Sequence, residues 1–343
     1  MRNALFTSLL VIFLLGPLTT FGKVNVVATS TDYASIALAI GGDLIVVSAI
    51  AKGDEDVHFV RPKPSFARMV GEADLLLTTG MDLELWLPGL IDKASNRQVQ
   101  EGQEGFVSVS AGITKLEIPA SADRSQGGVH LFGNPHIQTS PINMKVVARN
   151  IAIGLIKVDP DHKAEYEAGL ARFQSTLDER LFGKELVKMV GSSTLIRLAE
   201  SGKLISFLKK RRYKGKPMVD YLGGWLKKAL PLRGQQLVTY HKNWVYFSRL
   251  FGLEVVGEVE PKPSIPPSPK DVERLINLML SLKVRVVLAA NYFDEAKITR
   301  ITDVVDATPV IVPLSVAGAP GATDYFALVD LWLDSLLTAY GVL

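Results

Sequence analysis

Histidines stand out among the residues of this chain that could do chemistry. The 343 residues include only five histidines, and His58, His136 and His241 lie beside prolines or at the ends of apolar runs, where strands meet loops. Neutral imidazole is the commonest protein ligand for a transition metal. Metal sites form where separate strands deliver ligands to one crevice, so we expect these residues to bind a metal ion.

Four short segments carry the candidate ligands, and each has a pattern of its own. They are Asp56-Val57-His58 followed by Pro62-Lys63-Pro64-Ser65, then Asn134-Pro135-His136, then His241-Lys242-Asn243-Trp244-Val245-Tyr246-Phe247, and Asp324 in the glycine-bearing loop from Gly321 to Phe326. A loop aspartate is often only a helix cap, so that second role stays open for Asp324.

The N terminus has the plan of a secretory signal. A positive start at Arg2 is followed by an apolar stretch from Ala4 to Leu18 and by small residues up to Gly22. That stretch is shorter than the roughly 20 residues a membrane-spanning helix needs. We therefore predict a signal peptide over residues 1–22, cleaved after Gly22, with an uncleaved membrane anchor as the alternative.

Composition limits the compartment and the partners. The chain contains no cysteine, which excludes a disulfide framework, a thiolate zinc cluster and a lipid-bearing cysteine at the signal junction. We expect a protein free in the periplasm, without a lipid anchor. A net charge of +3 is too small to indicate nucleic-acid binding. With 48% hydrophobic residues the chain can fill the cores of two domains.

Buried strands alternate with helices in both halves of the chain. The expected strands are Val24–Ala28, Leu44–Ala51, Asp74–Thr78, Gly105–Ser108, Thr114–Ile118, Gln236–Tyr240, Glu254–Val259, Val284–Ala289 and Pro309–Leu314. The expected helices among them are Tyr33–Ile40, Pro64–Gly71 and Asp271–Leu282. This alternation predicts α/β lobes with mainly parallel sheets that are covered by helices on both faces.

The middle of the chain is helical. Apolar residues recur at helical spacing from Met144 to Leu155 and again from Tyr166 to Leu177, with almost no strand signal between residue 141 and about residue 190. A long helix between two α/β regions would be a stiff connector. We accordingly divide the chain into a signal peptide (1–22), an N-terminal lobe (23–145), a helical connector (146–190) and a C-terminal lobe (191–343).

Taken in order, the four ligand segments resemble the cluster A-I family of ABC-transporter substrate-binding proteins, which carry zinc or manganese. That family has a histidine followed by a Pro-x-Pro-Ser stretch, an Asn/Asp-Pro-His, a histidine that opens a helix, and a late aspartate near the terminal helix. The resemblance covers nearly the whole chain from Val24 onward. It implies two Rossmann-like lobes joined by one long connector helix, with the metal bound between the lobes.

The resemblance also implies the ligands. His58 and His136 would come from the first lobe, and His241 and Asp324 from the second. Three imidazoles and one carboxylate suit a four-coordinate zinc ion, whereas a manganese site is richer in oxygen ligands. Manganese carriers of the family tend to have a carboxylate where this chain has His241. We therefore expect Zn²⁺, with Mn²⁺ or Fe²⁺ as alternatives.

Two further features leave alternatives open. His130 lies in a glycine-rich loop where some zinc carriers of the family have a histidine-rich insert, so it is either a plain surface histidine or an auxiliary metal ligand. Residues 191–234 form a segment that is longer than its family counterpart and strongly basic from Lys203 onward. That basic segment is either a solvated helical insert or a surface for anionic lipid head groups or a permease.

The implied function is high-affinity binding of a divalent metal in the periplasm and its delivery, by a monomer, to the membrane permease of an ABC importer. A zinc-dependent hydrolase is the competing function. However, no His-Glu-x-x-His helix occurs, and a catalytic zinc usually has a general base nearby. We predict that the chain is not an enzyme. A metal-dependent adhesin or a metal chaperone without a permease stays open.

Overall fold

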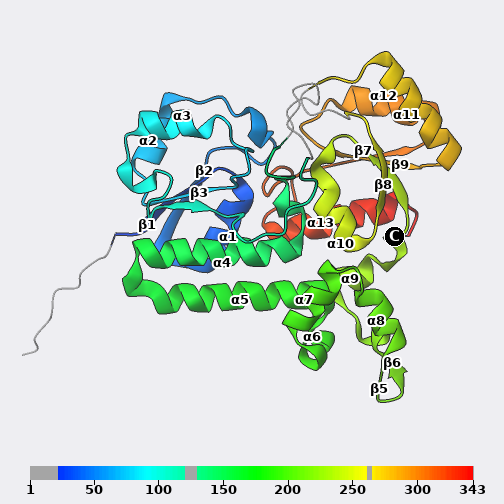
Figure 1. Cartoon of the computed structure of the whole chain (residues 1–343), viewed down its shortest axis with the longest axis horizontal. Coiled ribbons are helices and arrows are strands. Elements are labelled where there is room, and N and C mark those ends of the chain that lie inside the picture. Colours follow the sequence, from blue (N-terminus) through cyan, green and yellow to red (C-terminus); the bar gives the residue numbers. More distant parts are fainter. Residues whose placement is uncertain (1–21, 120–129, 261–264, 343) are drawn as a thin grey trace, which may run out of the picture.

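Two α/β lobes lie side by side in the computed structural model, above a pair of long helices and a smaller helical projection (Figure 1). The structure describes residues 22–119, 130–260 and 265–342. The predicted signal peptide lies outside these residues except for Gly22. Within the described ranges no helix is both long and apolar enough to cross a membrane.

The first lobe is built on a four-stranded parallel sheet with the strand order β2-β1-β3-β4. Its elements are β1 (Val24–Ala28), α1 (Thr31–Gly41), β2 (Ile45–Ala49), α2 (Pro64–Gly71), β3 (Leu75–Thr78), α3 (Leu87–Ala94) and β4 (Phe106–Ser108). Alternate residues of β3 pack into different cores, because Leu75 and Leu77 join the cluster with α1 whereas Leu76 joins the cluster with α2 and α3. Both faces of the sheet are therefore buried, which explains its continuous apolar strands.

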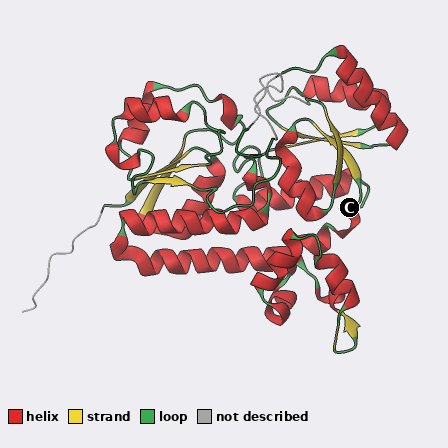
Figure 2. Ribbon diagram, viewed as in Figure 1, coloured by secondary structure: helices red, strands yellow, loops and turns green. Residues whose placement is uncertain are grey.

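The second lobe repeats this plan with the strand order β10-β9-β7-β8, again parallel. Its elements are β7 (Gln236–Thr239), α10 (Val245–Phe251), β8 (Glu254–Glu258), α11 (Pro269–Leu282), β9 (Val286–Ala290), α12 (Glu295–Val305), β10 (Thr308–Val312) and α13 (Tyr325–Ala339). Figure 2 shows helices on both sides of this sheet as well. In each lobe the carboxyl ends of the strands lead into loops that can carry a site.

Two helices run side by side beneath the lobes and are joined by a short turn at Pro160–His162. These are α4 (Pro141–Val158) and α5 (Lys163–Phe182). Helix α5 packs against α1 and α4, and its far end contacts α9 (Gly224–Lys228). A Cβ at Gly169 would lie 2.1 Å from the carbonyl oxygen of Ile40, so only glycine allows this close packing of α5 on α1. Near its end, Arg180 pairs with Asp330 of α13 at 3.0 Å, which ties α5 to the second lobe.

The projection follows α5 and consists of short elements. They are α6 (Lys184–Val190), α7 (Ser192–Glu200), α8 (Leu204–Lys210), β5 (Arg212–Tyr213) and β6 (Lys216–Pro217). Strands β5 and β6 form an antiparallel hairpin at its lower end in Figure 1.

The predicted fold class, two lobes with parallel sheets and a long helix, is confirmed. One predicted strand is wrong, because Thr114–Ile118 is an irregular segment. Glu117 has a φ of 51°, which no strand residue adopts. The carbonyl oxygen of Leu116 accepts from the loop residue Asn134, and its amide donates to the hydroxyl of Tyr246. The lobe boundaries at residues 145 and 190 stay a proposed division.

Candidate metal centre

The three predicted histidines lie where the two lobes meet. His58 lies in the 3₁₀ turn Val57–Phe59 after β2, and His136 precedes the turn Ile137–Thr139 that leads into α4. His241 follows β7 and precedes the turn Lys242–Trp244. Tight turns thus present all three rings in the space between the lobes. Those of His58 and His241 come after strands β2 and β7, whereas that of His136 leads into α4.

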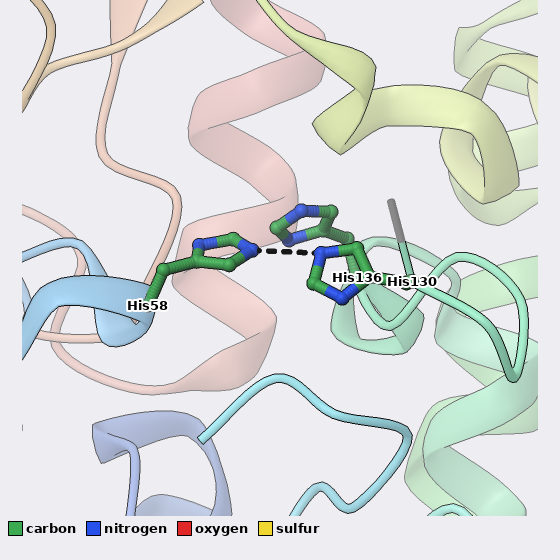
Figure 3. Close-up of side chains that lie close together, drawn as sticks. All are labelled: His58, His130 and His136. Carbon is green, nitrogen blue, oxygen red and sulfur yellow. Dashed lines mark hydrogen bonds between the residues drawn. The ribbon is translucent and has the colours of Figure 1, made fainter. Parts of the chain in front are cut away.

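A fourth histidine completes the group. One ring nitrogen from each of His58, His130 and His136 lies within 4.8 Å of the others, and the three rings point toward one another (Figure 3). The Nε2 atoms of His58 and His130 are 3.0 Å apart. In a tetrahedral zinc site with bonds of 2.0–2.1 Å, ligand nitrogens are roughly 3.3 Å apart. The pair formed by His58 and His130 is close to this separation, and the three rings are a candidate group of ligands for one ion.

His241 approaches this group from the second lobe. Its ring centroid lies 6.1 Å from that of His136 and 6.4 Å from that of His58, with the rings nearly perpendicular. Its Nδ1 is buried and accepts or donates no hydrogen bond within the described residues, although Glu260 Oε1 lies 3.6 Å away. A buried polar atom without a partner is costly, and a bound cation would relieve that cost.

Asp56 orients His58. Its Oδ1 accepts a hydrogen bond from the backbone amide of His58 at 3.0 Å and lies 2.6 Å from Nδ1 of the same residue. A carboxylate in this position keeps the proton on Nδ1, so that Nε2 presents its lone pair to the site. Burial would raise the pKa of Asp56, but the hydrogen bonds and charge of His58 outweigh it and lower that pKa.

His136 is held by contacts that cross between the lobes. Its backbone amide donates to Asn134 Oδ1 at 3.0 Å, and Asn134 Nδ2 in turn donates to the carbonyl oxygen of Lys242 at 2.7 Å. Asn243 Nδ2 lies 3.4 Å from Nε2 of His136. Nearby, the hydroxyl of Tyr325 donates to the carbonyl oxygen of Gln138 at 2.8 Å. These hydrogen bonds therefore join the two lobes next to the histidines.

Burial keeps these imidazoles neutral. Desolvation, and after it the charge of His58, lowers the pKa of His130 and that of His241 to about 4. The same two causes hold the pKa of His136 well below its usual value. Only neutral imidazole has a free lone pair for a metal. The site is thus ready to bind a cation at neutral pH without first losing protons from these three rings.

Asp324 is not brought to the histidines. It is exposed and caps α13, where its Oδ1 accepts a hydrogen bond from the backbone amide of Ala327 at 2.8 Å. Sequence alone does not separate a capping aspartate from a liganding one, because both stand in a loop before a helix. Conversely, the sequence left His130 open as either a plain surface histidine or an auxiliary metal ligand. Only the tertiary fold places it beside His58.

Two α/β lobes, a long helix that joins them and buried histidines between them define a two-lobed metal-binding protein. The sequence model of the zinc-uptake complex component A periplasmic family (ZnuA) matches residues 26–181 and 218–339. The chain belongs to this family, and members of the family are substrate-binding components of metal ABC transporters rather than enzymes.

Relatives with similar sequences carry names that refer to different metals. The iron-binding protein YfeA of Yersinia pestis is 24% identical over 328 residues, which cover 95% of this chain and 89% of that protein. The manganese ABC transporter substrate-binding lipoprotein scaA of Streptococcus gordonii is 30% identical over 155 residues. That match spans about half of each protein, 44% of this chain and 47% of the streptococcal one.

Solved structures share the fold. A crystal structure of ZnuA matches with a TM-score of 0.68 and 22% identity over 93% of this chain and 99% of that one. A manganese-bound periplasmic metal-binding protein from Candidatus Liberibacter asiaticus matches with a TM-score of 0.63 and 17% identity over 92% of this chain and 99% of that one. At these identities the likeness concerns the fold alone.

Proposed function

We propose that this protein binds one Zn²⁺ ion in the periplasm and delivers it to the membrane permease of an ABC importer. The observation that carries the proposal is the convergence of ring nitrogens from His58, His130 and His136 within 4.8 Å of one another, with the ring of His241 beside them. The cargo would be held by imidazoles from both lobes. Family membership supports the transport role.

The donor set favours zinc. We propose His58, His136 and His241 as ligands, as expected from the sequence, and add His130 to them in place of Asp324. Imidazole nitrogens suit Zn²⁺, whereas Mn²⁺ prefers sites rich in carboxylate oxygen. The nearest carboxylate on the first-lobe side, that of Asp56, is already engaged by His58.

Manganese or iron is the second candidate because relatives are named for these metals and because one carboxylate lies within reach. Glu260 Oε1 is 3.6 Å from His241 Nδ1, so a small rotation of its side chain would add an oxygen ligand. If Mn²⁺ is the cargo, Glu260→Gln should lower the affinity for Mn²⁺ far more than the affinity for Zn²⁺.

The decisive experiment is refolding of the mature chain in equal concentrations of Zn²⁺, Mn²⁺ and Fe²⁺ without oxygen, followed by metal analysis. We expect about one zinc per chain. A ligand that binds only the folded state stabilises it by about 4 kcal/mol at a thousandfold excess over Kd, so thermal unfolding should show the same preference. Manganese in the purified protein, or a zinc content near zero, would overturn the zinc assignment.

The location and the partner belong to the same proposal. The absence of cysteine supports a form without a lipid anchor, unlike the streptococcal lipoproteins, and we propose that it acts as a monomer. Deleting the gene should lower zinc accumulation by cells in zinc-poor medium. A His136→Ala copy should fail to restore it, whereas the wild-type copy should succeed.

A further inference from the structure

The projection after α5 interrupts the match between this chain and its family's sequence model. The family's sequence model matches up to residue 181 and resumes at residue 218, so it skips residues 182–217. These residues form α6, α7, α8 and the β5–β6 hairpin. A segment added to a shared fold has no part in the shared metal chemistry and requires an explanation of its own.

The tip of this projection is densely basic. Every charged residue from 209 to 216 is a cation, all are exposed, and no described residue forms an ion pair with any of them. These cations are Lys209, Lys210, Arg211, Arg212, Lys214 and Lys216. Surfaces that only need to be soluble usually mix charges of both signs, because clustered like charges repel one another. The cluster therefore indicates an anionic partner.

The hairpin is held in shape mainly by its arginines, and of its lysines Lys214 lies over the ring of Tyr213 at 5.4 Å. Arg212 donates from Nε and Nη2 to the carbonyl oxygen of Gly215, at 3.2 and 3.0 Å, and so closes the turn. Arg211 lies over the ring of Phe207 at 5.7 Å. Beneath the hairpin, Leu204 and Leu208 of α8 are buried in the main hydrophobic core. The four lysines thus extend from a tip that is firmly attached to the protein.

We propose that this hairpin docks on a lipid bilayer that carries anionic head groups. Lysines on a convex tip suit a flat, densely charged surface, which attracts each cation without a shaped pocket. Exposed Tyr213 at the same tip suits the boundary between head groups and acyl chains, where tyrosine is enriched.

The position of the hairpin favours a bilayer over the permease. In Figure 1 the projection extends below α5, whereas both lobes and the loops between them lie above α4. A permease that takes the ion from between the lobes faces the other side of the molecule. A bilayer can bind the hairpin while the metal centre remains open to the solvent.

The test uses the mature chain and vesicles of phosphatidylcholine, with or without phosphatidylglycerol, in a co-sedimentation assay. One variant carries Lys209→Gln, Lys210→Gln, Lys214→Gln and Lys216→Gln. The matched control loses four exposed lysines elsewhere, through Lys93→Gln, Lys157→Gln, Lys270→Gln and Lys283→Gln. Both variants should bind zinc as the wild type does, which verifies that they are folded.

We expect the wild type and the control to bind only the anionic vesicles, with binding that weakens as salt rises. The hairpin variant should bind them at least about tenfold more weakly. Equal binding of both vesicle types by the wild type, or equal losses in the two variants, would overturn the proposal. A second result would also overturn it: the wild type binds to permease in phosphatidylcholine nanodiscs, and the hairpin variant does not. The permease would then be the partner.

Discussion

The carboxylate of Asp32, in the first turn of α1, accepts a hydrogen bond from the backbone amide of Val316 in the other lobe at 3.0 Å. The two backbones also touch here, since a Cβ at Gly53 would lie 2.2 Å from the carbonyl oxygen of Val316. Burial, partly offset by these hydrogen bonds, raises the pKa of Asp32 from 3.8 to about 6. A titratable group therefore lies inside the contact between the lobes.

The first prediction concerns this carboxylate and uses the metal-free protein. Because its pKa is higher in the folded state, its contribution to stability is greatest below the unfolded value of 3.8 and is lost as the pH rises through about 6. The difference, 6 − 3.8 = 2.2 units, corresponds to roughly 3 kcal/mol at most. Asp32→Asn removes this charge and keeps an oxygen that can accept from Val316.

We therefore expect Asp32→Asn to gain stability relative to wild type as the pH rises from 3.8 to about 6, as measured by urea unfolding. Asp43→Asn, a change at an exposed aspartate, is the control and should show no such trend. A stability difference between Asp32→Asn and wild type that does not change with pH would mean that the carboxylate does not titrate in this range.

The second prediction assigns His130 to the site. Its Nε2 lies 3.0 Å from that of His58, so His130→Ala should remove a direct ligand. We expect zinc affinity to fall by more than the roughly 10- to 100-fold that loss of an outer-shell partner costs. Titration against a competing chelator measures this. The control is His162→Ala, because the ring of His162 contacts Asp159, and it should leave zinc affinity unchanged. If zinc affinity is unchanged in the His130→Ala variant as well, His130 is not a ligand.

The third prediction concerns the support of His58. Asp56→Ala removes the carboxylate that fixes the orientation of the ring, and we expect zinc affinity to fall by about 10- to 100-fold. The control is Asp54→Ala, which removes an equal charge from an exposed position in the same loop. It distinguishes the orientation of the His58 ring from the general effect of negative charge near the site. Equal losses in the two variants would show that only negative charge near the site matters.

The fourth prediction separates the two roles of Asp324. As a helix cap, Asp324→Ala should destabilise the protein by about 1 kcal/mol and leave zinc affinity unchanged, whereas Asp324→Asn should keep most of the stability. Chemical unfolding of the metal-free protein and zinc titration test the two parts. A tenfold or larger loss of affinity in both variants would restore Asp324 as a ligand.

Most of the fold could be predicted because its strands are buried on both faces. The run Val24–Ala28 is apolar except for Asn25 and forms β1 over the same residues. The segment Thr114–Ile118 alternates polar and apolar residues as a strand does, but it lies in an irregular path, since the left-handed conformation of Glu117 depends on tertiary contacts that local sequence does not encode.

The metal centre could be predicted only in part. His58 and His241 come after strands that can be read from hydrophobic runs, whereas His136 is indicated by the segment Asn134-Pro135-His136 before a helix. The position of His130 depends on contacts that are distant in sequence, with the ring of His58 and with the backbone of Asp82. Such long-range placement leaves no pattern in the neighbouring residues.

The proposed set of four imidazole ligands has a consequence for a protein that acts outside the cytoplasm. Thiolate ligands are lost when peroxide oxidises cysteine to sulfenic acid and beyond, and an oxidising compartment can also trap them as disulfides. This chain has no cysteine, and the four rings at its centre offer no sulfur to that chemistry. With the proposed ligands, the protein would therefore keep its ion-binding capacity under oxidant stress that would inactivate a cysteine-based carrier.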